Sequence, residues 1–155
     1  MNIQQAIQVA VEGTDLEQDQ AADAMREVMA GEATPAQFGA FVTAMRMKGE
    51  TPSEIAGMAA VMRDVSLHVD TDVDMIDTCG TGGSGLNWFN ISTASAFVVA
   101  GAGVPVAKHG NRAMSGSTGS ADVLEALGVN ITLGPEGVKN CFTKTEVGFM
   151  FAQAF

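Results

Sequence analysis

Four short segments of the sequence have the residue types that bind phosphate groups. They are residues 80–85, 90–93, 108–112 and 115–122, and they are rich in glycine, hydroxyl and amide side chains. Glycine lets the backbone approach an anion closely and direct successive N–H groups toward it. A helix that begins soon afterwards adds partial positive charge at its N-terminus. The first segment, Gly-Thr-Gly-Gly-Ser-Gly, is neither a Walker loop nor a spaced GxGxxG motif, so taken alone it indicates a structural turn as readily as a phosphate site.

The second and third segments add side chains suited to a polyphosphate. Asn90, Ser92 and Thr93 are more polar groups than helix capping requires, and they suit phosphate oxygens or a hydrated magnesium ion. The third segment contributes Lys108, His109, Asn111 and Arg112. The two basic side chains can neutralise a pyrophosphate, and the amide offers both a donor and an acceptor. The histidine is equally consistent with a structural role.

The distribution of charge supports an anion site. The net charge is −10, which argues against a nucleic-acid backbone as partner. Fourteen of the 18 acidic residues lie at or before Asp77, and none lies between Thr78 and Ala121, where the four segments are concentrated. Composition alone favours a buried core segment that excludes charge. Four motifs at predicted strand-to-helix turns within this stretch favour a polyphosphate ligand instead.

Composition also narrows the class of protein. Apolar residues make up 46% of 155 residues, enough for one compact domain or two small ones. No apolar run is long enough to span a membrane, and residues 1–5 do not resemble a signal peptide. The two cysteines, Cys79 and Cys141, lack the spacing of a zinc or disulfide framework, so we expect a reducing, cytoplasmic location.

Residues 1–64 are predicted to be helical. Apolar residues recur at helical spacing near residues 3–11 and 22–29, and Gly31 is placed to end the second helix. Thr34 and Thr51 each precede a proline and begin a capping-box pattern, which predicts two further helices. Apolar residues at i, i+3, i+4 and i+7 predict that each of these helices buries one stripe. The two stripes are Phe38, Phe41, Val42, Met45 and Ile55, Met58, Ala59, Met62.

After a connection at residues 65–74 the pattern changes to alternating strands and helices. We expect strands at residues 75–77, 104–108 and 149–152, a loop at 109–119, and helices at about 90–102, 120–127 and 135–144. This alternation predicts a parallel sheet, so residues 75–155 form the first part of a mainly parallel α/β domain. The last strand ends three residues before Phe155. Because parallel strands are normally covered by helices, we expect either an edge strand or part of a longer protein.

The order and spacing of the motifs resemble the anthranilate phosphoribosyltransferase family. The segments that carry the resemblance are Gly80-Thr81-Gly82-Gly83, Asn90-Ile91-Ser92-Thr93, Lys108-His109-Gly110-Asn111-Arg112 and Gly119-Ser120-Ala121-Asp122. The resemblance covers essentially the whole chain, and the Lys-His-Gly-Asn-Arg block is its most specific part. It implies a small helical domain for homodimerisation, followed by an α/β domain of the nucleoside phosphorylase and phosphoribosyltransferase type. The implied reaction moves phosphoribose from phosphoribosyl pyrophosphate to the amine of anthranilate, in tryptophan synthesis, and releases magnesium pyrophosphate.

The resemblance also implies a donor site, an acceptor site and a metal ligand. The implied donor contacts are Gly80, Thr81, Gly82, Gly83, Ser84, Trp88, Asn90, Ile91, Ser92, Thr93, Lys108, His109, Asn111, Arg112, Ser115, Gly116 and Ser120. Gly80 and Asn111 would also contact anthranilate, and Ser92 would be a ligand of Mg²⁺. The resemblance assigns no catalytic residue in this chain.

Three departures from the family pattern leave alternatives open. Ser84 stands where the family usually has aspartate, and Trp88 where a small hydroxyl residue is common. The family's second half, with an acidic pair for magnesium and an arginine that faces anthranilate, is not in the sequence. One alternative is a pyrimidine nucleoside phosphorylase, although the Lys-His-Gly-Asn-Arg block disfavours it. The other is a truncated chain that binds anions without turnover, so we expect weak donor binding and inefficient transfer.

Overall fold

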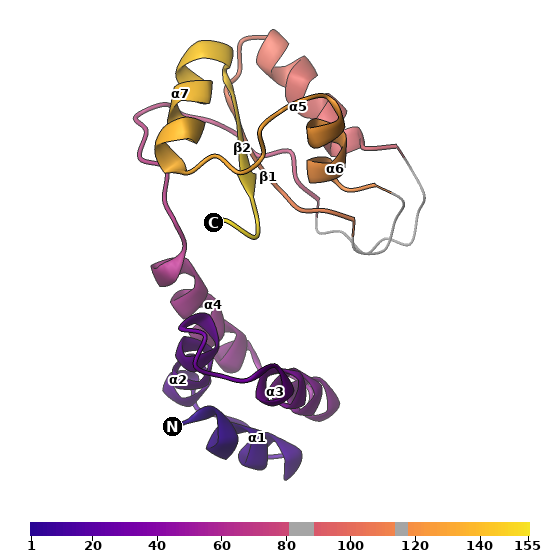
Figure 1. Cartoon of the computed structure of the whole chain (residues 1–155). Coiled ribbons are helices and arrows are strands. Elements are labelled where there is room, and N and C mark those ends of the chain that lie inside the picture. The colour runs from indigo at the N-terminus through magenta and orange to yellow at the C-terminus, as the bar shows by residue number, and fades with distance from the viewer. Residues whose placement is uncertain (81–88, 114–117) are drawn as a thin grey trace. The chain divides into compact units, whose positions relative to one another are not determined.

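The computed structural model describes residues 1–80, 89–113 and 118–155, and the chain divides into two compact units, Met1–Ser66 and Leu67–Phe155. Figure 1 labels the elements of both. The first unit consists of α1 (Ile3–Val11), α2 (Gln18–Met29), α3 (Pro35–Lys48) and α4 (Pro52–Val65). The described part of the second contains α5 (Ile91–Gly101), β1 (Val106–Gly110), α6 (Ser120–Ala126), α7 (Pro135–Thr145) and β2 (Val147–Phe151). The predicted fold class, a helical domain followed by the start of a parallel α/β domain, is confirmed.

The helices of the first unit begin where the capping signals predict. The side chains of Thr34 and Thr51 accept hydrogen bonds from the N–H groups three residues further on, at 3.2 and 3.3 Å. These bonds satisfy backbone donors that a helix start leaves without a partner. After α2 the chain turns at Gly31, whose φ of 73° favours glycine. Local chemistry of a few residues is therefore sufficient to delimit these helices.

The core of the first unit is formed by the inner faces of α1, α2 and α3. Its buried members are Ile3, Ala6, Ala10, Leu16, Ala21, Ala24, Phe41, Ala44 and Met45. The stripe predicted for α3 is only partly correct, because Phe38 is 45% and Val42 is 47% exposed. The small alanines of α1 and α2 bring the helices close together, so a narrower strip of α3 is enough to fill the core.

The stripe predicted for α4 is mostly wrong, because Met58 alone of its members packs against the core. The buried residues of α4 are Glu54, Gly57 and Val61, whereas Ile55 and Met62 are about half exposed. Glycine at position 57 lets the backbone of α4 approach the start of α2. A Cβ there would overlap the carbonyl oxygen of Gln18 and lie 3.1 Å from its carbon. The close approach of two backbones, and not apolar periodicity, therefore decides which face of α4 is buried.

Glu54 is buried because its carboxylate serves as a hydrogen-bond hub. It accepts the backbone N–H groups of Leu16 and Thr51, both at 2.7 Å, and the ammonium group of Lys48 at 3.0 Å. Lys48 also donates to Asp15 at 2.7 Å. Burial opposes ionisation of Glu54, but the hydrogen bonds outweigh it and lower the pKa of this carboxyl. The hub joins the chain before α2 to the start of α4.

The second unit is built on parallel strand pairing. β1 pairs with β2 in the register Val106 to Val147 through Gly110 to Phe151. Figure 1 shows the two strands side by side, with α7 on one side and α5 and α6 on the other. The strand predicted at residues 75–77 is reduced to a single parallel bridge between Ile76 and Val106. Among the described residues, these three stretches run in the same direction.

β1 lies two residues later than predicted. Pairing with β2 begins at Val106, whose N–H donates to the carbonyl of Glu146 at 2.8 Å. It continues to Gly110, whose carbonyl accepts the N–H of Ala152 at 3.0 Å. His109 and Gly110 therefore belong to the strand and not to the following loop, because β2 extends far enough to pair with them.

Two small apolar clusters stabilise the second unit. One consists of Ala121, Leu124, Ile131, Phe149 and Phe151, and the other of Ala96, Ala100 and Val106. α5 buries Ala96 and Ala100 and leaves Ala94, Phe97 and Val98 exposed. In the part of the chain that the structure describes, no helix is both long and apolar enough to span a membrane.

Candidate phosphate-binding site

The candidate site lies where the parallel stretches end. Ile76, β1 and β2 run in one direction, so the residues that follow them meet at one edge of the sheet. Ligands of open α/β sheets gather at this carboxyl edge. Residues 77–80 follow the first stretch and residues 111–113 follow β1. The helix α5 begins at Ile91, so its N-terminal turn can face the same edge.

Lys108 and Ser92 form the centre of the site. The lysine side chain is buried, with a residue exposure of 2%, and its Nζ donates to Ser92 Oγ at 3.3 Å. The hydroxyl of Thr78 donates to the carbonyl of Ser92 at 2.8 Å. Residues from three separate stretches of the chain thus meet around the first turn of α5. The structure brings together the basic residue and the hydroxyl residue that the motifs predict.

A second set of bonds joins the start of α5 to the start of α6. The hydroxyl of Thr93 donates to Ser120 Oγ at 3.0 Å. Asn90 Nδ2 lies 3.2 Å from the carbonyl oxygen of Thr118 and 3.4 Å from that of Gly119. Segments 90–93 and 118–120 are therefore held side by side. The hydroxyls and amides of both can face one ligand.

The surroundings of Lys108 shift its pKa in two opposing directions. Burial lowers the pKa of Lys108, and the negative charge of Asp77 acts in the opposite direction. A hydrogen bond with Asp77 raises the pKa of the Cys79 thiol, which burial raises further. Because Lys108 is buried, its ammonium group is poorly solvated. An anion that binds to it would therefore displace little water.

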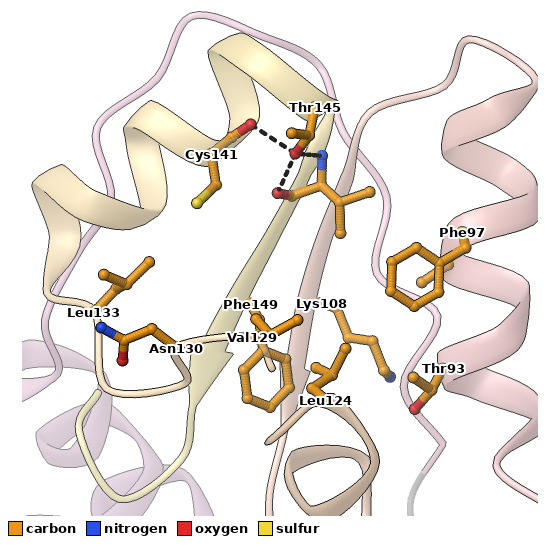
Figure 2. A pocket seen from close by; sticks show the side chains of 12 residues that line it. Thr93, Phe97, Lys108, Leu124, Val129, Asn130, Leu133, Cys141, Thr145 and Phe149 are labelled. Carbon is orange, nitrogen blue, oxygen red and sulfur yellow. Dashed lines mark hydrogen bonds between the residues drawn. The ribbon is translucent and has the colours of Figure 1, made fainter. Parts of the chain in front are cut away.

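Behind Lys108 lies a largely apolar cavity of about 330 Å³. Its described lining includes Phe97 of α5, Leu124 of α6, Cys141 of α7 and Phe149 of β2. Figure 2 shows the Lys108 side chain crossing this lining and ending beside Thr93. Among the described lining residues, the lysine carries the charge. Its aliphatic stem therefore packs against apolar groups while its ammonium reaches the phosphate edge.

Not every predicted site residue joins this arrangement. His109 is exposed, and strand alternation places it on the face opposite Lys108. The guanidinium of Arg112 is bound to Asp122 and Glu125. Asn111 Oδ1 accepts the N–H of Arg112 at 2.8 Å. Gly80 is exposed at the end of its segment.

Part of the predicted site lies outside the described residues. These positions are Thr81, Gly82, Gly83, Ser84, Trp88, Ser115 and Gly116. Two residues that were not among the predicted contacts also join the site: Thr78, which lies outside all four segments, and Thr118, which lies within segment 115–122. The usable signal was their place, directly after Asp77 and directly before the Gly-Ser-Ala-Asp segment.

The described residues do not by themselves form a magnesium cage. No group of three His, Cys, Asp or Glu side chains is placed to hold a metal within the described ranges. Ser92 offers a hydroxyl oxygen, a ligand type that Mg²⁺ accepts together with substrate phosphates. This hydroxyl oxygen accepts a hydrogen bond from the ammonium of Lys108. A metal at Ser92 thus fits only together with an anionic ligand that separates it from the lysine.

Family models match most of the chain. The helical bundle domain of the glycosyl transferase family matches residues 4–66, and the a/b domain of that family matches residues 72–155. The chain is 62% identical to the anthranilate phosphoribosyltransferase of Chloroflexus aurantiacus (strain J-10-fl) and 60% identical to that of Herpetosiphon aurantiacus. Each alignment covers all of this chain and 46% of the relative. The chain therefore spans about half the length of the curated relatives it matches.

Solved structures agree with these matches. The anthranilate phosphoribosyltransferase (TrpD) of Thermus thermophilus is 43% identical, with a TM-score of 0.78 over 97% of this chain and 46% of that one. The Saccharomyces cerevisiae enzyme in complex with PRPP and Mg has a TM-score of 0.77 at 22% identity, over 99% of this chain and 47% of that one. The second likeness shows the fold alone.

Proposed function

This chain belongs to the glycosyl transferase family, and we propose that it binds phosphoribosyl pyrophosphate for transfer of phosphoribose to the amine of anthranilate. One observation carries the proposal: the buried ammonium of Lys108 lies 3.3 Å from Ser92 Oγ at the carboxyl edge of parallel strands. The surrounding sequence contains no acid from Thr78 to Ala121. A buried cation among hydroxyls, without acids in the same stretch, suits a pyrophosphate.

The proposed donor contacts are of two kinds. Lys108 opposes the charge of the pyrophosphate, and Asn90, Ser92, Thr93 and Ser120 supply hydroxyl and amide groups. The other implied donor positions, at residues 80–84, 88, 91, 109, 111–112 and 115–116, complete the proposed site. Gly80 and Asn111 are also the proposed anthranilate contacts. These additional donor and anthranilate contacts are supported by the resemblance of their motifs to the family.

The reaction creates charge that these groups can stabilise. The bond between C1 of the ribose and the pyrophosphate oxygen breaks as the amine nitrogen forms a bond to C1, and the amine then loses a proton to solvent. Negative charge grows on the leaving pyrophosphate, where Lys108 and the hydroxyl donors stabilise it. Magnesium bound with the donor neutralises part of the same charge. Ser92 is its proposed protein ligand, and no catalytic base is assigned.

We propose in addition that the chain is a cytoplasmic homodimer that associates through the first unit. α3 supports this, because Phe38 and Val42 are each nearly half exposed one turn apart on the same side of the helix. An apolar strip of this kind on an otherwise well-formed helix suits a partner helix. Both cysteines of the chain are unpaired, which suits a reducing compartment.

Donor binding is the direct test, because the relatives named for the transfer are about twice as long. Calorimetric titration with phosphoribosyl pyrophosphate and magnesium should show saturable binding that ribose 5-phosphate does not match. Loss of anthranilate fluorescence in the presence of donor would report transfer itself.

The alternative of a pyrimidine nucleoside phosphorylase is not favoured, since the similar proteins carry the anthranilate phosphoribosyltransferase name. Phosphate-dependent cleavage of thymidine, with no heat of binding from phosphoribosyl pyrophosphate, would overturn the proposal. Saturable binding of inorganic pyrophosphate alone, equal in affinity to the donor, would reduce it to a general anion site.

A further inference from the structure

The carboxylate of Asp122 connects two stretches of chain on either side of residues 114–117. Its Oδ2 accepts the N–H of Ala113 at 2.9 Å and the N–H of Gly119 at 2.7 Å. Its Oδ1 accepts a guanidinium N–H of Arg112 at 3.2 Å. One side chain in the first turn of α6 thus forms a closure that joins residues 112 and 113, just after β1, to Gly119, just before α6.

Close packing at Gly119 supports the same closure independently. A Cβ at this position would lie 2.5 Å from the nitrogen of Ala113 and 2.5 Å from the carbonyl carbon of Arg112. The φ of Gly119 is −92°, a value that any residue adopts. Space, and not backbone conformation, therefore requires glycine here, because the backbone of residues 111–113 lies against Gly119.

Residues 118–120 are attached to the candidate site. Asn90 donates to the carbonyls of Thr118 and Gly119, and Thr93 donates to Ser120 Oγ. The same turn of α5 carries Ser92, the partner of Lys108. The position of residues 118–120 relative to the lysine therefore depends both on these bonds to α5 and on the bonds of Asp122 to residues 112, 113 and 119.

Arg112 strengthens the closure. Its guanidinium donates to both oxygens of Glu125, at 2.8 and 3.0 Å, and lies 5.7 Å from the centre of the Phe151 ring. Hydrogen bonds from Gly119 and Ala113 lower the pKa of Asp122, and Arg112 lowers it further. The carboxylate is thus ionised at neutral pH, and both of its oxygens accept hydrogen bonds from residues 112, 113 and 119.

We propose that Asp122 is a positioning residue for donor binding, which holds segments 111–113 and 118–120 together so that Ser120 lies beside Thr93 of α5, next to Ser92 and Lys108. The inference rests on the proposed function. Asp122 does not bind the donor itself, because its oxygens are engaged by the segment and a carboxylate would repel pyrophosphate. It affects donor binding indirectly, because it fixes the backbone of Ala113 and Gly119.

The test compares Asp122→Asn with Glu136→Gln. Both substitutions remove one negative charge from the first turn of a helix, and Glu136 is exposed at the start of α7. Amide hydrogen exchange is measured by ¹⁵N NMR, affinity for phosphoribosyl pyrophosphate with magnesium by calorimetry, and stability by thermal unfolding. Asp122→Asn should accelerate exchange at Ala113 and Gly119 and weaken donor binding by about tenfold, or about 1.4 kcal/mol, while the chain stays folded. Glu136→Gln should do neither.

Two results would overturn the inference. One is unchanged exchange at both amides in Asp122→Asn. The other is faster exchange with a donor affinity equal to that of Glu136→Gln. If the unmodified chain does not bind the donor, the proposed function fails and the positioning role with it, although the exchange data would still report the closure. Should Asp122→Asn not fold, Asp122→Glu, which keeps the charge and moves it by one methylene, is expected to change both readouts in the same direction.

Discussion

The ammonium group of Lys108 on β1 lies 3.3 Å from the hydroxyl oxygen of Ser92 on α5, and the lysine side chain is almost completely buried. Within the described part of the chain, no carboxylate forms an ion pair with this lysine. A buried charge held by a hydroxyl is costly, so its presence at the carboxyl edge of the sheet points to an anionic ligand. The cost of burial and the gain on ligand binding can be measured separately.

Replacement of Lys108 by methionine should separate binding from stability. Lys108→Met keeps the packing of the aliphatic stem but removes the charge, so affinity for phosphoribosyl pyrophosphate should fall by about ten- to a hundredfold, the loss expected for a hydrogen bond to a charged group. The free energy of unfolding should stay constant or rise, since an unpaired buried charge is lost. Calorimetry and urea unfolding report the two effects. Lys139→Met, an exposed lysine on α7, is the control, and equal donor affinity in both variants would contradict the assignment.

Donor affinity should fall as pH rises through the lowered pKa of Lys108, at a pH below the ordinary lysine value of 10.5. The ammonium is present below that pKa and lost above it, while the phosphates of the donor are already ionised from about pH 7. The free energy of unfolding should change in the opposite direction. Because burial disfavours the charged lysine, the chain is destabilised while Lys108 is protonated, and this destabilisation disappears as pH rises. Calorimetric titrations between about pH 7 and 10 should show this fall in the unmodified chain and not in Lys108→Met. A parallel decline in both proteins would refute it.

Two helical glycines should respond in opposite ways to alanine. Gly57→Ala places a Cβ against the backbone of Gln18 and should destabilise the first unit by about 1–3 kcal/mol or more, as overpacking does. Gly39→Ala, in the interior of α3 with nothing within 4 Å of the new Cβ, should stabilise by about 0.5–1 kcal/mol through helix propensity. Urea unfolding followed by circular dichroism measures both. The packing of α4 on α2 would be wrong if both variants gained stability.

Glu54→Gln should destabilise the first unit by about 3 kcal/mol, since it leaves Lys48 buried without its inner partner. Glu50→Gln, at an exposed position just before α4, should change stability little. Because the folded-state pKa of Glu54 is lowered, its contribution is complete above the unfolded pKa and is lost as pH falls through the folded value. The free energies of unfolding of Glu54→Gln and Glu50→Gln should therefore differ less at acidic pH than at neutral pH. A difference that does not depend on pH would rule out the ionised hub.

Self-association should depend on the exposed strip of α3. Phe38→Glu combined with Val42→Glu should shift the chain toward monomer, because charge is costly in an apolar interface. Ala40→Glu combined with Thr43→Glu adds the same charge on another side of α3 and should leave association unchanged. Sedimentation at about 50 µM, a concentration at which misassembly is also observed, distinguishes the outcomes. A monomeric unmodified chain at that concentration would contradict the homodimer proposal.

Local features of the sequence predicted the helix starts and the class of the fold. Capping by Thr34 and Thr51 is decided within about four residues, and both caps form as predicted. The alternation of strands and helices after residue 75 predicted a parallel sheet, which the pairing of β1 with β2 confirms. The length of each strand was less predictable, because β1 extends only as far as its partner does.

By itself, the sequence determined where helices begin, that the sheet is parallel, and that Lys108 and Ser92 belong to one acid-free stretch. Only the tertiary structure decided which partner each basic side chain of that stretch has. Arg112, which follows the same strand, is bound by Glu125 of α6, whereas Lys108 is bound by a hydroxyl of α5. The reason is physical: residue spacing along a chain sets local hydrogen bonds, but the partner of a long basic side chain is whichever group the packing of helices on the sheet brings within about 3 Å.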